Sequence, residues 1–377
     1  MTIRILEGDS RQTLRELERE SVHAVVTSPP YWGLRDYGTG RWEGGEPGCE
    51  HRRGNARADH SGAHLRGRGE QASSDAARTP MRERCTLCGA VRIDSQLGLE
   101  PTPAEYVRAL ADVMDEVRRV LRDDGTLWLN LGDAYSHGGS GARDTGRWPK
   151  QSRNDHKTEH AKKATGLRPK SLLGLPWRVA LAMSERGWIL RSDIVWHKPN
   201  PMPESVRDRP TKAHEYVFLF AKSERYFYDA HAIAEPFSNG PEGAVPWGKN
   251  DRQYDYGGRD AAAEAVGQHR HLATGTGTGW TPKGEGRNAR TVWTIGARPY
   301  PGAHFAVFPV ELARRCILAG CPKGGVVLDP FAGTGTVGEV AATTGRDAIL
   351  CELNPLYIAQ MRERFVTRAP LLAREAS

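Results

Sequence analysis

The stretch Gly325-Val-Val-Leu-Asp329-Pro-Phe-Ala-Gly333-Thr-Gly335 decides the fold of this chain. Its apolar first part predicts a buried strand, which a glycine-rich loop joins to a helix over 337–344. A second strand, predicted over 347–351, ends at Glu352, and Asn354-Pro355 then opens a last helix with an N-cap and a proline at its first turn. A strand, glycine loop, helix, strand and acid in this order indicate a nucleotide-like cofactor in an α/β fold.

The acidic residues at the two strand ends indicate which cofactor this is. Gly333, Gly335 and Gly338 also fit the G-x-G-x-x-G pattern of dinucleotide sites, so a nicotinamide dehydrogenase is a rival interpretation. The carboxylate of Asp329 would repel a pyrophosphate but would suit a cationic amino-acid group, and Glu352 can accept both ribose hydroxyls. The pair fits S-adenosylmethionine, which carries a ribose, an ammonium and a sulfonium but no phosphate.

A second motif, Ser28-Pro29-Pro30-Tyr31, lies near the other end of the chain and follows an apolar strand predicted over 22–26. Two prolines fix the backbone and remove two donors, so the carbonyls of Ser28 and Pro29 are left free to accept hydrogen bonds. Tyr31 adds a flat face for stacking. Acceptors at the edge and an aromatic ring on the face suit a planar amine, whereas a plain proline-rich turn is the alternative.

Together the two motifs resemble the amino-group DNA methyltransferases of the β arrangement, in which the catalytic half precedes the cofactor half. The resemblance continues through residues 6–9, 128–133, 195–200, 209–216 and 304–312 and covers most of the chain. It implies a Rossmann-like, S-adenosylmethionine-dependent methyltransferase fold: a mostly parallel sheet with helices on both faces, a circularly permuted motif order and irregular insertions.

The resemblance also implies roles for individual residues. Asp9 would contact the adenine ring or its amine, unless it only caps the helix that starts at Ser10. The segment around Phe308 would flank the methionine tail, unless Phe305 and Phe308 are ordinary core residues. The implied cofactor set is Asp9, Phe305, Phe308, Pro309, Asp329, Phe331, Ala332, Gly333, Thr334, Gly335 and Glu352, and the implied base-pocket or DNA set is Trp32, His197, Lys198, Asn200 and Arg209.

The predicted reaction transfers a methyl group to the exocyclic amine of a base that has been flipped out of duplex DNA. Tyr31 would stack on the base, while the Ser28 hydroxyl and the Pro29 carbonyl would accept hydrogen bonds from the amine. Serine at the first motif position favours cytosine N4, and adenine N6 stays open. A methyltransferase acting on a non-DNA amine and a DNA-binding module without activity are further alternatives.

The order of predicted elements suggests four regions. Residues 1–35 and 98–235 form the catalytic half, 36–97 an insertion, 236–295 the target recognition region, and 296–377 the cofactor half. Helices are predicted over 11–19, 103–124, 172–183 and 310–319, and strands over 3–6, 126–131, 188–196 and 216–221. Thr102 and Glu105 form a capping box at the start of the second helix. Residues 238–290 are rich in glycine and combine cations with aromatics, as a DNA-reading loop would.

The insertion carries a candidate metal site. Cys49 and His51 precede a Cys85-x-x-Cys88-Gly89 knuckle, and thiolates with an imidazole are the usual zinc ligands. Four protein ligands would make a structural zinc site, and unpaired cysteines on a loop are the alternative. Cys316, Cys321 and Cys351 lie in apolar contexts and are expected to be buried spectators.

Composition agrees with this interpretation without deciding it. Lys and Arg number 53 against 46 Asp and Glu among 377 residues, and this small basic excess suits a double-stranded DNA partner if it is clustered. No run of 18 apolar residues predicts a membrane span, and six cysteines without a regular framework fit a reducing compartment. We therefore expect a cytoplasmic protein of a prokaryotic cell or a phage, with a homodimer and a restriction nuclease on a separate chain as open questions.

Overall fold

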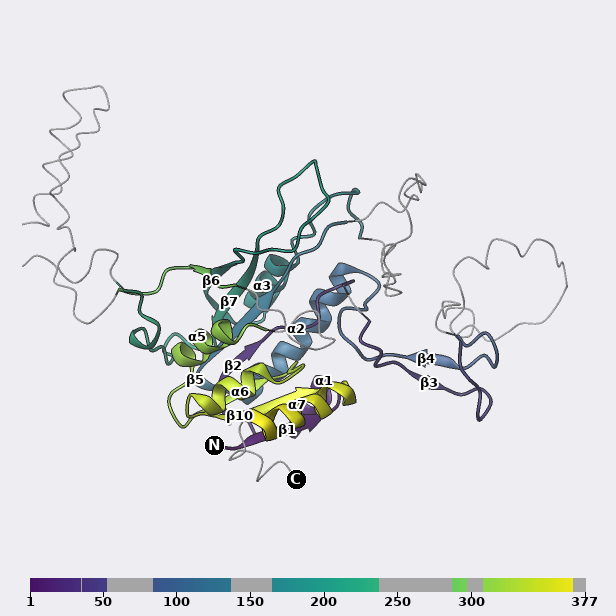
Figure 1. The fold of residues 1–377 in the computed structure, drawn as a ribbon, viewed down its shortest axis with the longest axis horizontal. Coiled ribbons are helices and arrows are strands. Elements are labelled where there is room, and N and C mark those ends of the chain that lie inside the picture. Colours follow the sequence, from purple (N-terminus) through teal and green to yellow (C-terminus); the bar gives the residue numbers. More distant parts are fainter. Residues whose placement is uncertain (35, 53–83, 137–164, 237–286, 297–307, 369–377) are drawn as a thin grey trace, which may run out of the picture.

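The computed structural model describes residues 1–34, 36–52, 84–136, 165–236, 287–296 and 308–368 (Figure 1). Their centre is an eight-stranded sheet with the strand order β1-β10-β9-β2-β5-β7-β6-β8. The five strands from β1 to β5 in this order pair in parallel, β7 is antiparallel to both of its neighbours, and β6 pairs in parallel with β8. The expected mostly parallel sheet is therefore confirmed. The strands are β1 (Ile3–Glu7), β2 (Val22–Thr27), β5 (Leu121–Leu131), β6 (Ile189–His197), β7 (His214–Ala221), β8 (Val292–Thr294), β9 (Val326–Asp329) and β10 (Asp347–Glu352).

Helices cover both faces of this sheet, and each face has its own apolar core (Figure 1). Side chains alternate along a strand, so Val25 of β2 joins one core while Ala24 and Val26 join the other. The Val25 side is covered chiefly by α2 (Pro103–Val120) and α3 (Leu175–Glu185), and the other side by α5 (Val310–Gly320), α6 (Thr336–Thr343) and α7 (Pro355–Arg368). Burial on both faces explains why the central strands β2, β7 and β9 consist largely of apolar residues.

The strand order brings the two ends of the chain together. β9 lies between β10 and β2, and Val25 of β2 pairs with Leu328 of β9 although about 300 residues separate them in sequence. The carboxyl ends of β9 and β2 are thus adjacent. This arrangement confirms the permuted order, with both motifs beyond the carboxyl ends of parallel strands.

The first predicted helix, 11–19, is shorter in the structure. α1 (Ser10–Thr13) passes into a single 3-10 turn, Leu14–Glu16, and the chain then leaves the helical path. The guanidinium of Arg119 on α2 donates to the carbonyl oxygens of Leu14 and Leu17, at 2.6 and 3.0 Å. These tertiary bonds satisfy carbonyls that further helical turns would otherwise have used, and local sequence does not reveal them.

Further differences concern element ends and the insertion. α2 ends at Val120 rather than at 124, and β5 begins directly at Leu121. α3 begins at Leu175 rather than at 172, because Gly174 takes a left-handed conformation with φ 67° and Pro176 occupies the first turn. Within the insertion, β3 (Arg41–Glu43) and β4 (Val91–Ile93) form an antiparallel ribbon that was not predicted, and Figure 1 shows it projecting from the edge of the sheet region. Among the described residues, no helix is long and apolar enough to cross a membrane.

The capping box at the start of α2 is confirmed and gives a stability prediction. The Glu105 amide donates to Thr102 Oγ1 at 3.2 Å, and the Thr102 amide donates to Glu105 Oε2 at 3.0 Å. Thr102→Ala leaves the first of these donors without its partner, so we expect the free energy of unfolding to fall by about 1 kcal/mol in urea titrations. Thr102→Ser keeps the hydroxyl and should lie within a few tenths of a kcal/mol of the unmodified protein. Equal losses in the two variants would contradict the capping role.

Candidate active site

The glycine loop 330–335 connects β9 to α6 and is held by backbone bonds and by α7. Gly333 and Gly335 have φ of 53° and 79°, which a side chain would disfavour. At Gly335 a Cβ atom would also stand 2.5 Å from Met361 Cγ of α7. The buried guanidinium of Arg364, likewise on α7, donates to Thr334 O at 3.0 Å. The loop is therefore fixed in shape by the last helix.

Glu352 closes the other side of this loop. Its Oε2 accepts the Gly333 amide at 2.7 Å and its Oε1 accepts the Asn354 amide at 2.8 Å. Burial is the main cause that raises the pKa of this carboxyl. Each carboxylate oxygen has a second lone pair, so both can still accept a hydroxyl of a ribose.

Asp329 lies at the end of β9, against the strand that leads to Ser28. Thr27 Oγ1 and the Phe331 amide both donate to its Oδ1, at 2.6 and 3.0 Å. The side chain is 4 % exposed, and burial raises its pKa to about 7, an effect that the Thr27 bond partly opposes. Such a carboxyl gains from any cation that approaches it, because a positive charge offsets the cost of ionising a buried acid.

The Ser28-Pro29-Pro30-Tyr31 turn follows β2 and is held by hydrogen bonds with α2 and with residues 98–100. Tyr106 of α2 donates its hydroxyl to the Pro30 carbonyl at 3.0 Å, and the Gly33 amide donates to the Gly98 carbonyl at 2.9 Å. The Trp32 indole is 6 % exposed and donates to the Glu100 carbonyl at 2.9 Å. In this structure Trp32 packs in the core under the turn, and that packing accounts for its presence without a base contact.

A chain of hydrogen bonds runs from Ser28 through Tyr31 into the sheet. Ser28 Oγ donates to Tyr31 Oη at 3.4 Å, and Tyr31 Oη donates to Glu215 Oε2 of β7 at 2.7 Å. Asn130 of β5 lies within reach of both, with its Oδ1 3.1 Å from Tyr31 Oη and its Nδ2 3.2 Å from Glu215 Oε2. Gly132 lies so close to the phenol ring that a Cβ there would stand 2.5 Å from Tyr31 Cε2. The position of the ring is thus set by its hydroxyl and by one close glycine.

Lys198 completes the network at the other oxygen of Glu215. Its ammonium pairs with Glu215 Oε1 and lies 4.2 Å from the centre of the Trp196 ring. The structure thus connects Lys198, one of the residues expected at the base pocket, to Tyr31 through a single carboxylate. Sequence reasoning did not assign Glu215 or Asn130 to the site, although the segments that contain them belonged to the resemblance.

The other expected base-pocket residues lie around this network. His197 Nδ1 is 3.2 Å from Thr294 Oγ1 of β8, and Asn200 is exposed beyond the end of β6. The guanidinium of Arg209 pairs with Glu204 at 2.6 Å and stacks 3.9 Å from the centre of the Tyr135 ring. Contact of these three residues with a base or with DNA stays a prediction.

The expected cofactor residues outside the loop have ordinary structural partners. Asp9 caps α1 by accepting the Arg11 amide at 2.9 Å and pairs with the Arg11 guanidinium at 2.5 Å, so the capping alternative is observed and contact with adenine stays a prediction. Phe308 is partly buried against the core, and Pro309 is the N-cap of α5. Phe305 lies outside the described residues.

The fold and the site define a Rossmann-like methyltransferase of the permuted type, and comparison with known proteins identifies its family. The family model described as "DNA methylase" (N6_N4_Mtase) matches residues 22–363. The type II methyltransferase M.SmaI of Serratia marcescens is 37% identical over 97% of this chain and 91% of its own length. The type II methyltransferase M.Cfr9I of Citrobacter freundii is 37% identical over 94% of this chain and 84% of its own length.

The chain belongs to the N4-cytosine/N6-adenine DNA methylase family. It is therefore an S-adenosylmethionine-dependent DNA methyltransferase of the class that modifies cytosine N4 or adenine N6. The solved structure titled PvuII DNA methyltransferase (cytosine-N4-specific) has the same fold, with a TM-score of 0.53 at 17% identity, covering 98% of this chain and 88% of that one.

The raised pKa of Asp329 predicts a pH dependence of stability. Because the folded-state pKa of about 7 lies above the ordinary value of 3.8, the stabilising contribution of the protonated form is complete below about pH 4 and is lost as the pH rises through about 7. Asp329→Asn cannot ionise. Between pH 5 and pH 8 the unmodified protein should therefore lose on the order of 2 kcal/mol of unfolding free energy relative to this variant.

Urea denaturation of the cofactor-free protein at several pH values measures this difference. Asp193→Asn, at an exposed position of β6, serves as the matched control. Parallel stability profiles for the unmodified protein and Asp329→Asn would contradict the raised pKa.

Proposed function

We propose that the protein methylates the N4 amine of cytosine in double-stranded DNA, with adenine N6 as the alternative target. The observation that carries the proposal is the adjacency of two sites: the Ser28 turn follows β2, and the glycine loop follows Asp329 at the end of the neighbouring strand β9. A methyl donor bound at the loop would lie beside an amine held at the turn. Serine at position 28 supports cytosine over adenine.

In the proposed mechanism the target base is flipped from the duplex and held by Tyr31, Ser28 and Pro29. The amine donates to the Ser28 hydroxyl oxygen and to the Pro29 carbonyl, so that its lone pair faces the methyl carbon of the cofactor. S-adenosylmethionine, when bound, would supply the methyl group: the nitrogen–carbon bond would form as the carbon–sulfur bond breaks, with the bonding pair left on sulfur. The methylated nitrogen then releases a proton. Orientation and electrostatics account for the rate, and no covalent intermediate with the enzyme is required.

The hydrogen-bond chain supports this role for Ser28. Tyr31 donates its hydroxyl proton to Glu215, so its oxygen accepts the hydroxyl proton of Ser28. The lone pairs of Ser28 Oγ are therefore left to accept a hydrogen bond from the substrate amine. Glu215, neutralised by Lys198, is in this proposal a positioning residue that sets the direction of the whole chain.

The remaining assignments belong to the same proposal. S-adenosylmethionine binds the glycine loop, with Asp329 at its ammonium and Glu352 at its ribose. Residues 236–295 form the target recognition region, most of which lies outside the described residues, and 36–97 form an insertion. The enzyme acts in the prokaryotic cytoplasm as the modification partner of a restriction nuclease on another chain. Pairing into a homodimer is a further hypothesis.

The first test is a methyl-transfer assay on unmethylated duplex DNA, followed by nucleoside mass spectrometry of the digest. We expect N4-methylcytosine and a product that depends on S-adenosylmethionine. N6-methyladenine would keep the mechanism and overturn the choice of base. Absence of any methylated nucleoside, in a protein that binds the cofactor, would contradict the proposal that DNA is the substrate.

Tyr31 variants separate stacking from the hydrogen-bond chain. Tyr31→Ala removes the aromatic face, which is worth about 1–3 kcal/mol per stacked base, so kcat/KM for DNA should fall about 5- to 150-fold. Tyr31→Phe keeps the face and removes the hydroxyl that joins Ser28 to Glu215, so we expect KM for DNA to stay close to the unmodified value while kcat falls. Steady-state kinetics with labelled cofactor measures both constants. A kcat of Tyr31→Phe equal to that of the unmodified enzyme would show that the chain is unimportant.

A further inference from the structure

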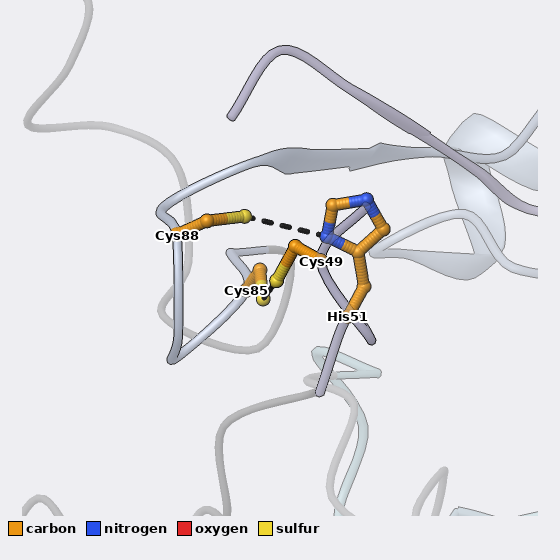
Figure 2. A group of neighbouring side chains, drawn as sticks. All are labelled: Cys49, His51, Cys85 and Cys88. Atoms are coloured by element: carbon orange, nitrogen blue, oxygen red, sulfur yellow. Dashed lines mark hydrogen bonds between the residues drawn. The ribbon is translucent and has the colours of Figure 1, made fainter. Parts of the chain in front are cut away.

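We propose that Cys49, His51, Cys85 and Cys88 bind one structural Zn²⁺ ion, which closes the far end of the β3–β4 ribbon. The structure brings these residues together from two segments that lie more than 30 positions apart in sequence. Figure 2 shows Cys88 facing the His51 ring and the sulfur atoms of Cys49 and Cys85 side by side. The proposal does not depend on the methyl-transfer function.

The distances fit a tetrahedral zinc site. The four ligand atoms all lie within 4.8 Å of one another. The two sulfur atoms of Cys49 and Cys85 are 3.9 Å apart, and Cys88 Sγ is 3.3 Å from His51 Nδ1. Zinc–sulfur and zinc–nitrogen bonds of about 2.3 and 2.0 Å at tetrahedral angles give edges of about 3.8 and 3.5 Å. Both observed edges lie close to these values.

The backbone around Cys85 favours a thiolate. The amides of Arg52 and Leu87 both approach Cys85 Sγ at 3.4 Å, so two donors point at one sulfur atom. The Gly89 amide donates to the Cys85 carbonyl at 2.9 Å, and Gly89 has a φ of 75°, which closes the turn after Cys88. A sulfur that accepts two backbone amides is suited to carry negative charge, as a metal-bound cysteine does.

Two neighbours hold the remaining ligands in place. The Trp42 ring of β3 stacks on the His51 imidazole with 5.1 Å between ring centres, which fixes the plane of the imidazole. Gly45 lies against Cys88, where a Cβ atom would stand 2.6 Å from Cys88 Sγ. Trp42 thus packs against the imidazole, and the missing side chain of Gly45 leaves space for the Cys88 sulfur.

The β3–β4 ribbon is too short to be stable in water by itself. β3 and β4 contribute three residues each, and a two-stranded sheet of this size is at best marginally stable in water. Four protein ligands close the coordination sphere, so the ion would stabilise structure rather than bind substrate. It would tie residues 49–51 to 85–88 and so join the two ends of the segment 53–83. The base of the insertion is held separately, by bonds such as that from Asn354 Nδ2 to the Tyr37 carbonyl at 3.1 Å.

A disulfide between Cys49 and Cys85 is the rival use of these thiols. Its sulfur atoms would be about 2.05 Å apart, whereas the observed separation is 3.9 Å. A disulfide between Cys49 and Cys85 would also not explain why Cys88 and His51 lie beside them. The contact of Cys88 Sγ with His51 Nδ1 at 3.3 Å therefore favours the metal.

The test is the zinc content of the full-length chain, purified with a thiol reductant and without chelator, and measured by atomic emission. We expect about one zinc per chain, falling to less than about a tenth in Cys88→Ser and His51→Ala. His60→Ala and His64→Ala, in the same insertion, are the matched controls and should keep the ion. Cobalt(II) exchanged for zinc should show the visible absorption of a tetrahedral thiolate site in the unmodified chain and not in Cys88→Ser.

Two results would overturn the proposal. One is a folded chain, with normal circular dichroism, that holds no zinc after growth and purification in zinc-supplemented medium. The other is an intact mass two hydrogens lower than the reduced chain, with Cys49 and Cys85 joined in peptide mapping. Because the readout is metal content, a failed methyl-transfer assay would leave this test unaffected, and the reverse holds as well.

Discussion

The pairing of β2 with β9 is the constraint on which the rest of the site depends. It is a short parallel contact, with Ala24 opposite Val327 and Val25 opposite Leu328, but it joins segments from opposite ends of the chain. Just beyond these pairs, Thr27 Oγ1 donates to Asp329 Oδ1 at 2.6 Å, so the residue before Ser28 is bonded to the acid that precedes the glycine loop. In the proposed function, this contact would place the methyl donor beside the acceptor amine. A change in its register would separate them, because neighbouring strand residues point to opposite faces.

The same reasoning explains why permutation of the motifs does not alter the chemistry. Parallel strands present their carboxyl ends at one edge of a sheet, and the order in which the chain visits them is free. Here the chain forms β1 and β2 first and returns to β9 and β10 last, yet both motifs reach the same edge. In the hydrogen-bond network around Tyr31, Glu215 is the one residue that lies at the start of a strand, the antiparallel strand β7. Its reversed direction places Glu215 beside Tyr31, which follows the end of β2, and beside Asn130 in the last residues of β5.

Much of this arrangement could be predicted from the sequence, because it depends on local patterns. Apolar runs located most of the strands, Asn354 and Pro355 located the start of α7, and the burial of Cys316, Cys321 and Cys351 followed from their apolar neighbours. What could not be predicted rests on contacts between distant residues. Three such contacts are hydrogen bonds between residues far apart in the sequence. Arg119 bonds to the carbonyl of Leu14 at the end of α1, Arg364 bonds to the glycine loop, and Tyr31 bonds to Glu215. No pattern in the neighbouring sequence predicts them. The ribbon of the insertion could not be predicted because its strands are only three residues long, too short to show a periodic pattern.

The two acids beside the glycine loop, Asp329 and Glu352, suggest how the proposed site would select a cationic ligand. Burial raises the pKa of both Asp329 and Glu352, and the charge of Glu352 adds to the effect at Asp329. Ionising Asp329 within the folded protein therefore costs free energy. An ammonium at its carboxylate would remove that cost, whereas a pyrophosphate would increase it. The glycine loop alone would suit either cofactor, because its backbone geometry is shared by both classes of site. In the proposed arrangement, discrimination comes from the sign of the charge at the strand ends: a dinucleotide is rejected by the same carboxyl group that S-adenosylmethionine neutralises.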